Sequence, residues 1–171
     1  MTRSRHGYCQ RMLRIGAAAL LAASFAATSQ TRSLVGKPAP AFVRRDLHGQ
    51  TINLRKLRGK VVLLNFWATW CAPCQTEMPV FDSWQRKYAP QGLALIGISM
   101  DDDAEAARKV IEKLGISYPV AMGDAKLGEL YGRVLGLPMT FLIGRDGRVV
   151  AQFQGEADLN SMEREIKAAL H

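Results

Sequence analysis

Two cysteines placed where a buried strand gives way to a helix constrain this sequence more than any other feature. The apolar, branched run Val61–Trp67 predicts a strand that is buried on both faces of a sheet. The segment Pro73–Tyr88 predicts a helix with an apolar stripe. Cys71 and Cys74 stand at the start of that helix, where free N–H groups and the positive dipole end stabilise a thiolate. The placement predicts that Cys71 is the attacking thiol and Cys74, within the first turn, the resolving one.

The residues around the two cysteines suit the same junction. Pro73 is tolerated in the first turn of a helix because its missing N–H would have no helical partner there. Trp70 precedes the cysteine pair and is expected on the active surface, whereas Trp67 and Trp84 are expected in the core. Ala72 and Pro73 separate the cysteines and are expected, with Trp70, to contact the substrate. They do not set the reduction potential, which spans roughly 150 mV among Cys-x-x-Cys proteins.

Other uses of the cysteine pair fit less well. The third cysteine of the chain, Cys9, lies ahead of the first apolar run. A disulfide between Cys71 and Cys74 would close a very small loop and would therefore be a poor stabilising crosslink. A zinc site would need two further ligands, and no second Cys-x-x-Cys occurs. The histidines are His6, His48 and His171. We expect no metal and no cofactor beyond a redox-active disulfide between the two cysteines.

Residues 1–28 have the pattern of an export signal. A basic start without acidic residues precedes the apolar run Ile15–Ala27, which suits a signal peptide and is short for a membrane span. Cleavage is expected near residue 26, and the alternative is an uncleaved membrane anchor. Residues 29–36 are expected to form a tether, and residues 37–171 one folded domain. The chain would then work in the periplasm, an oxidising compartment in which leftover thiols become disulfides.

The formal net charge of +8 does not indicate a nucleic-acid binder. Four of the 23 basic residues lie in residues 1–28, and most of the others are scattered instead of forming a stripe. One short group is expected to be a solvated loop, with a docking patch as the alternative. It consists of Arg55, Lys56, Arg58 and Lys60. We expect a monomer that acts on proteins and has no nucleic-acid partner.

The order of the predicted elements defines an α/β domain. Two short strands around residues 42–45 and 50–53 form an N-terminal hairpin, and residues 118–120 form a short extended piece. Further strands are predicted at Leu93–Ser99, Met139–Ile143 and Arg148–Phe153. Helices are predicted after the acidic start Asp101–Asp103, at Lys126–Tyr131 and at Leu159–Leu170. Right-handed crossovers should pair the first strands in parallel, and the later hairpin adds antiparallel strands. The result is a mixed central sheet with helices on both faces and an N-terminal β-hairpin extension.

Several segments in combination resemble the thioredoxin superfamily. Residues 65–74, Asn-Phe-Trp-Ala-Thr-Trp-Cys-Ala-Pro-Cys, are similar to the active-site strand and helix of thioredoxins. Residues 136–143 are similar to their strand led by a cis-proline, and residues 146–149 to the hairpin that follows it. Residues 36–42 and 46–54 resemble the exported TlpA/ResA/DsbE-like branch. The resemblance covers about residues 35–170 and implies the thioredoxin fold.

The resemblance also implies roles for further residues. Pro138 is expected to be cis and to lie against the dithiol, which leaves the backbone of Leu137 free to pair with an extended substrate. From the residues alone, Pro138 could simply begin a strand. Asn65 stands where cytosolic thioredoxin has a buried aspartate that accepts the proton of the resolving thiol. Glu77, one turn after Cys74, stands where the ResA-like branch has an active-site acid, which would handle the proton of Cys74 or raise thiol pKa values. The alternative is an exposed acid at a helix start.

The implied activity is the reduction of disulfides in exported proteins. The branch suggests apocytochromes c awaiting haem, or proteins that assemble copper centres, as substrates, and a membrane electron-transfer protein as the donor. A general oxidase is an alternative. A peroxiredoxin-like peroxidase would need Pro and Thr or Ser where Leu64 and Ala68 stand. A non-catalytic copper-binding chaperone of the related type uses Cys-x-x-x-Cys and a distant His, but no His follows Cys74 until His171.

Overall fold

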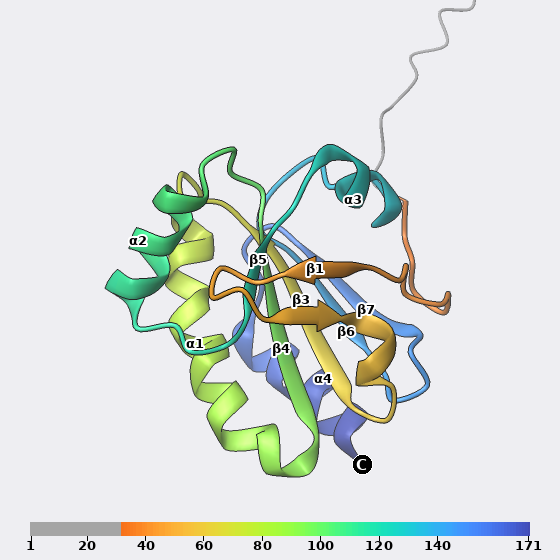
Figure 1. The fold of residues 1–171 in the computed structure, drawn as a ribbon. Helices are drawn as coiled ribbons and strands as arrows, with labels where there is room; N and C mark the ends of the chain where they lie inside the picture. Colours follow the sequence, from red (N-terminus) through yellow and green to blue (C-terminus); the bar gives the residue numbers. More distant parts are fainter. Residues whose placement is uncertain (1–31) are drawn as a thin grey trace, which may run out of the picture.

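The computed structural model describes residues 32–171, so the predicted signal peptide and the start of the predicted tether lie outside the described residues. A five-stranded sheet in the order β5-β4-β3-β6-β7 stands beside a two-stranded sheet, β1-β2 (Figure 1). The strands are β1 (Val43–Arg45), β2 (Thr51–Asn53), β3 (Val61–Trp67), β4 (Leu93–Ser99), β5 (Val120–Met122), β6 (Met139–Ile143) and β7 (Val149–Gln154). The helices are α1 (Ala72–Tyr88), α2 (Ala104–Leu114), α3 (Ala125–Leu130) and α4 (Leu159–Leu170). Within residues 32–171, no helix combines the length and apolar character that a membrane span requires.

Strand β3 is the centre of the larger sheet. All seven of its residues are buried, as its continuous apolar run predicts. It pairs in parallel with β4 on one side and antiparallel with β6 on the other. Parallel neighbours need a crossover connection, and α1 supplies it between β3 and β4. Because α1 begins just after the carboxyl end of β3, the cysteine pair is placed at that end of the sheet.

The alternating side chains of β3 divide the core between the two faces of the sheet. Leu63 and Trp67 lie in the cluster formed with α1, α2 and α4. Leu64 and Phe66 lie in the cluster formed with the hairpin β1-β2 and α3. In Figure 1 the hairpin crosses in front of the central strands and α4 lies behind them. Helices therefore cover both faces, as expected, and the hairpin covers the same face as α3.

The N-terminal hairpin is an integral part of this second core cluster. Phe42, Ile52 and Leu54 are buried in it. The N–H of Leu47, in the turn of the hairpin, donates to the carbonyl of Val120 in β5 at 2.8 Å. The extension is thus held by apolar burial and by hydrogen bonding to the edge of the main sheet.

The packed chain begins earlier than the predicted boundary at residue 37. The N–H of Gly36 donates to the carbonyl of Val149 at 2.8 Å, and the N–H of Leu34 donates to the side chain of Gln152 at 3.1 Å. Residues 34–36 therefore pack along β7 instead of belonging to a tether. The reason is that β7 is an edge strand, whose outer backbone groups need partners.

Three local predictions differ in detail from the structure. Of the predicted acidic helix start, only Asp103 caps α2 with its side chain, and Asp101 contacts a different loop. The basic group expected in a loop overlaps the 3-10 helix Leu54–Leu57, and the Arg58 guanidinium donates to the backbone carbonyl of Asp146. The extended piece at 118–120 leads into a strand, β5, because its backbone pairs with the edge of β4.

Candidate active site

The two cysteines of the motif form a disulfide at the N-terminus of α1. The Cys71–Cys74 bond has an S–S distance of 2.01 Å. Cys71 is the N-cap residue of α1, and its sulfur accepts a hydrogen bond from the N–H of Cys74 at 3.3 Å. The same N–H can stabilise a thiolate at Cys71 after reduction, together with the positive end of the helix dipole.

The two cysteines differ in their access to solvent. The Cys71 residue retains 4% of its surface exposed and Cys74 none. Trp70, directly before the pair, is 72% exposed, so this loop lies at the protein surface. An incoming thiolate or substrate disulfide can therefore reach Cys71 but not Cys74. Trp67 and Trp84 are both buried, as predicted for core aromatics.

Asp101 clamps the loop that leads to the exposed Trp70 and to Cys71. Its two carboxylate oxygens accept the N–H of Thr69 at 3.1 and 3.0 Å, and one of them accepts the Thr69 hydroxyl at 2.7 Å. The hydroxyl of Ser99 donates to the other oxygen at 2.8 Å. The carbonyl of Thr69 in turn accepts the side-chain amide of Gln75 at 2.6 Å. Hydrogen bonds to an ionised carboxylate such as that of Asp101 are stronger than bonds between neutral groups. The loop is therefore held by Asp101 on one side and by Gln75 on the other.

The sequence holds a signal for this clamp that the interpretation of Asp101 as a helix start missed. Strands β3 and β4 have equal length and pair in parallel, with Trp67 opposite Ser99. Two residues further along, Thr69 and Asp101 leave the same edge of the sheet at matching positions. Asp101 follows β4 by the same number of residues as Thr69 follows β3. The sequence alone could therefore have placed Asp101 beside the loop that follows β3.

Glu77 lies on the buried face of α1, together with Cys74. It is only 3% exposed, so it is not the exposed acid of the alternative interpretation. One carboxylate oxygen accepts the N–H of Ala157 at 3.1 Å, and the other has no hydrogen-bond partner among the described residues. Burial raises the pKa of Glu77; the hydrogen bond from Ala157 opposes that rise and the nearby charge of Glu156 adds to it.

The burial of Glu77 could have been deduced from helix periodicity. The spacing from Cys74 to Glu77 and on to Phe81 follows the three- and four-residue steps of one helix face. That face is the apolar stripe already predicted for this helix. Residues three apart on a helix have Cβ atoms roughly 5–6 Å apart, so the carboxyl group begins one turn from Cys74.

Asn65 offers no carboxylate in the position of the thioredoxin aspartate. It is fully buried in β3, and its amide donates to the hydroxyl of Thr140 in β6 at 2.9 Å. The two residues are directly opposite each other in the antiparallel pair. An amide oxygen is a very weak base, so Asn65 cannot take up a thiol proton. Glu77 is therefore the buried carboxyl group nearest to Cys74 along the chain.

The peptide bond between Leu137 and Pro138 is cis, as the resemblance implies. Pro138 is buried and Leu137 partly so. The carbonyl of Pro138 accepts the N–H of Gly155 at 2.9 Å, two residues before the Ala157 N–H that binds Glu77. Residues 155–157 thus link the cis-proline to the buried acid. In the sequence motif, Ala72 is exposed and Pro73 is partly buried.

We predict that Asp101→Asn loosens the loop before Cys71. The substitution removes a charged acceptor and should lower the free energy of unfolding by about 1–3 kcal/mol. It should also shift the pH profile of Cys71 alkylation in the reduced protein, because Thr69 no longer has a fixed position. Urea unfolding and alkylation rates measure the two effects. Asp102→Asn is the control, because Asp102 is exposed. Equal behaviour of the two variants would contradict the clamp.

A second prediction concerns the stability of the oxidised protein. Because the fold raises the pKa of Glu77, the folded chain holds this proton more tightly than the unfolded chain. The free energy of unfolding should then decrease as the pH rises from the ordinary glutamate pKa through the raised one. Glu77→Gln should remove this decrease, as measured by urea titrations across the pH range. The control, Glu165→Gln, changes an exposed acid of α4 and should keep the wild-type slope. If the free energy of unfolding depended on pH in the same way in the wild type and in both variants, folding would not raise the pKa of Glu77.

Comparison with known proteins identifies the family. Residues 35–152 match the model of the AhpC/TSA family. The ResA thiol-disulfide oxidoreductase of Bacillus thuringiensis subsp. konkukian is 38% identical over 143 residues, which cover 82% of this chain and 81% of that protein. ResA of Bacillus anthracis is 41% identical over 134 residues, covering 78% and 77%. A crystal structure assigned as the thiol:disulfide interchange protein DsbE of Chlorobium tepidum has a TM-score of 0.76 and 34% identity, covering 81% of this chain and 100% of that one.

The site geometry agrees with these similarities. A Cys-x-x-Cys disulfide at a helix N-terminus provides the reactive pair. The two positions at which a peroxidase would need polar or proline residues, Leu64 and Ala68, are apolar and fully buried. The chain therefore belongs to the AhpC/TSA family of thioredoxin-fold proteins and is a thiol-disulfide oxidoreductase related to ResA and DsbE.

Proposed function

We propose that this protein reduces disulfides of exported proteins in the periplasm. The observation that carries the proposal is the unequal burial of the two cysteines, with Cys71 at 4% exposure beside the exposed Trp70 and Cys74 fully enclosed. This arrangement lets one sulfur exchange with an external disulfide while the other is kept for the internal step. The ResA relatives, named as thiol-disulfide oxidoreductases, support the same chemistry.

The reaction begins with the reduced dithiol. The Cys71 thiolate attacks one sulfur of the substrate disulfide, forming a mixed disulfide and releasing the other substrate sulfur as a thiolate, which takes up a proton. Cys74 loses its proton and attacks the Cys71 sulfur. This step reforms the Cys71–Cys74 disulfide and releases the second substrate thiol. Two electrons have passed to the substrate, and a membrane electron-transfer protein with its own dithiol must return them through Cys71.

The surface around Cys71 is suited to an extended polypeptide. Trp70 and Ala72 are exposed on either side of the cysteine, and Pro73 follows them. Among the described residues, the backbone N–H of Leu137 donates to no other backbone group. An extended substrate segment can pair with that backbone, as an added strand would, and present its disulfide to Cys71. Pro138 has no N–H to donate, so the backbone donor offered to the substrate at this point is that of Leu137.

Glu77 is proposed to serve the resolving cysteine. Its carboxyl group lies on the same buried face, and its raised pKa makes it a better proton acceptor than an ordinary glutamate. When ionised, its negative charge disfavours a thiolate nearby and so raises thiol pKa values. A less stable thiolate makes the dithiol a stronger reductant, which suits a protein that reduces disulfides in an oxidising compartment.

Export and the identity of the substrates belong to the proposal as well. The signal-like residues 1–28 support export, with either cleavage or retention as a membrane anchor. Substrates such as apocytochromes c or copper-centre assembly proteins contain cysteines that must be reduced before haem or copper is bound. The exposed Trp70 and the open backbone at Leu137 provide general contacts for such chains.

The roles of the two cysteines can be tested by trapping. Cys74→Ser should accumulate mixed disulfides between Cys71 and partner proteins, because the resolving thiol is missing. Cys71→Ser should accumulate few, because the remaining thiol is fully buried. Non-reducing electrophoresis and mass spectrometry of the full chain, isolated from cells, measure both. Equal trapping by the two variants would refute the assignment.

The role of Glu77 can be tested in the reduced protein. Glu77→Gln should lower the pKa of Cys71 or Cys74 and raise the reduction potential, because a negative charge is removed. It should also reduce a model disulfide more slowly, since the proton of Cys74 loses its acceptor. Alkylation across the pH range, equilibration with glutathione buffers and reduction kinetics measure the three effects.

The matched control is again Glu165→Gln, whose thiol titration and rates should equal those of the wild type. The wild-type potential should lie nearer the value of about −270 mV for thioredoxin than that of about −120 mV for DsbA. A potential near the DsbA value would favour the general oxidase instead. Superimposable curves for Glu77→Gln and the wild type would leave the carboxyl group without a role in the chemistry.

A further inference from the structure

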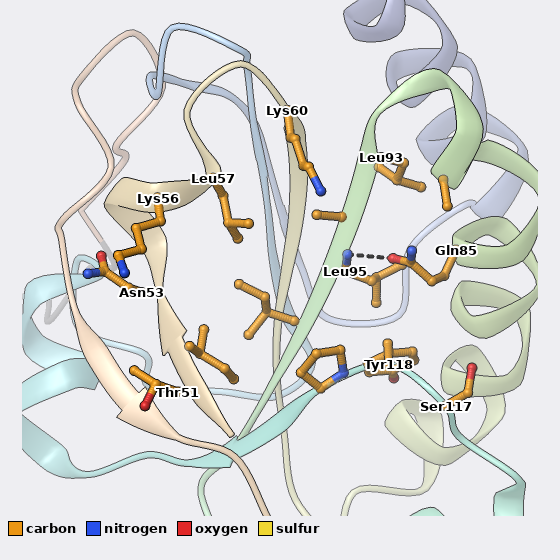
Figure 2. A pocket seen from close by; sticks show the side chains of 15 residues that line it. Thr51, Asn53, Lys56, Leu57, Lys60, Gln85, Leu93, Leu95, Ser117 and Tyr118 are labelled. Atoms are coloured by element: carbon orange, nitrogen blue, oxygen red, sulfur yellow. Dashed lines mark hydrogen bonds between the residues drawn. The ribbon is translucent and has the colours of Figure 1, made fainter. Parts of the chain in front are cut away.

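A groove of about 550 Å³ lies on the molecule away from the dithiol (Figure 2). It is built over Leu93–Ile96, at the amino end of β4. Cys71 follows the carboxyl end of β3, which runs parallel to β4. Ile96, the groove residue of β4 nearest that end, lies three residue steps, or about 10 Å, from Ser99, and Cys71 lies four residues beyond Trp67, the partner of Ser99. The groove is therefore distinct from the site already described.

The groove exists because β5 is too short to cover β4. Strand β5 pairs only with Gly97–Ser99, so the edge of Leu93–Ile96 has no partner strand. The carboxyl-terminal half of α1 stands on one side of this edge, and β2 with the following 3-10 helix on the other. The N–H of Leu95 points outward from the uncovered edge and donates to the side-chain oxygen of Gln85 at 2.7 Å, as Figure 2 shows. This bond occupies the position that a neighbouring strand would need.

The lining combines an apolar floor with positive charge. Its apolar members are Ile52, Leu57, Ala89, Leu93, Ala94, Leu95, Ile96 and Pro119. Lys56 and Lys60 stand at its rim, and no Asp or Glu is among its lining residues. Neither lysine forms an ion pair with a described residue. In Figure 2 the ammonium group of Lys60 points toward β4, across the groove.

A buried hydroxyl group adds a second polar feature. Tyr118 lines the groove, is 3% exposed, and its hydroxyl has no hydrogen-bond partner among the described residues. An unpaired buried hydroxyl costs about 1–3 kcal/mol. Burial raises the pKa of Tyr118, so the group remains a potential donor to an oxygen atom. Concave, mainly apolar sites with a few such polar groups are typical of small-molecule binding, at roughly 300–1,000 Å³.

From these observations we propose that the groove binds a small organic carboxylate with an apolar body. The carboxylate lies beside Lys60, whose ammonium group points across the groove, and Lys56 at the rim adds positive charge; the ligand supplies the negative charge that the lining lacks. The apolar body covers the side chains along the open edge of β4. A peptide strand is disfavoured, because the Gln85 side chain already occupies the N–H of Leu95. Binding here is independent of the dithiol, so it does not rest on the reductase activity.

The test uses octanoate as the probe and octanamide as its neutral counterpart. In NMR spectra of the oxidised full chain, octanoate should shift the backbone amide of Leu95 and the side-chain amide of Gln85 in a saturable way. Octanamide should bind about tenfold more weakly, a loss of about 1.4 kcal/mol. The preference for octanoate should shrink as salt is added, because the lysines are at the rim. Reading the shifts at Leu95 separates groove binding from contacts of octanoate elsewhere on the chain.

Variants locate the site. The double variant Lys56→Gln with Lys60→Gln should weaken octanoate binding about tenfold and make it equal to that of octanamide. Lys109→Gln, at an exposed position on α2, is the matched control and should bind as the wild type does. Cys71→Ser should also bind octanoate normally, which separates this proposal from the redox function. Absence of saturable shifts at Leu95, equal binding of both probes, or normal binding by the double variant would overturn it.

Discussion

The burial of β3 on both faces is the constraint on which the rest of this structure depends. A strand enclosed in this way must pair on both edges, and β4 and β6 supply the parallel and antiparallel partners. The parallel partner requires a crossover helix, which begins where β3 ends and so carries Cys71 at its N-cap. The antiparallel partner begins directly after the cis-proline. One buried strand thereby brings the cysteine pair and the cis-proline segment to the same end of the sheet.

Access and electrostatics then distinguish two cysteines that are chemically the same. Cys71 takes the N-cap position beside the exposed Trp70, where helix N–H groups stabilise negative charge. Cys74 lies one turn inside, on the buried face shared with Glu77. The raised pKa of that acid comes from the same burial that hides the sulfur. Asp101 adds a mechanical element, since its hydrogen bonds to Thr69 hold the loop from which Cys71 is presented.

Much of the site was predictable because its residues are adjacent in sequence. Trp70 through Cys74 form one local unit, and a helix N-terminus has the same electrostatic effect in any fold. The cis bond at Pro138 was implied by resemblance, since the residues alone also allowed a simple strand start. Asp101 was misassigned because three consecutive acids suit a helix start, whereas its actual partner, Thr69, lies 32 residues away. The 34–36 segment was similarly misjudged, because its polar sequence does not reveal the open edge of β7.

The sequence by itself determined the order of strands and helices, the reactive cysteine pair and the turn of α1 on which Glu77 lies, because all of these depend on local periodicity and spacing. Tertiary structure decided how deeply Glu77 is buried, which loop Asp101 holds and how far β5 extends along β4. The groove over Leu93–Ile96 belongs to this second group, since its walls come from α1, the hairpin and the segment before β5. The physical reason is that the burial of a side chain and the unpaired edge of a strand both depend on segments distant in the chain. The residue pattern of one segment therefore does not reveal them.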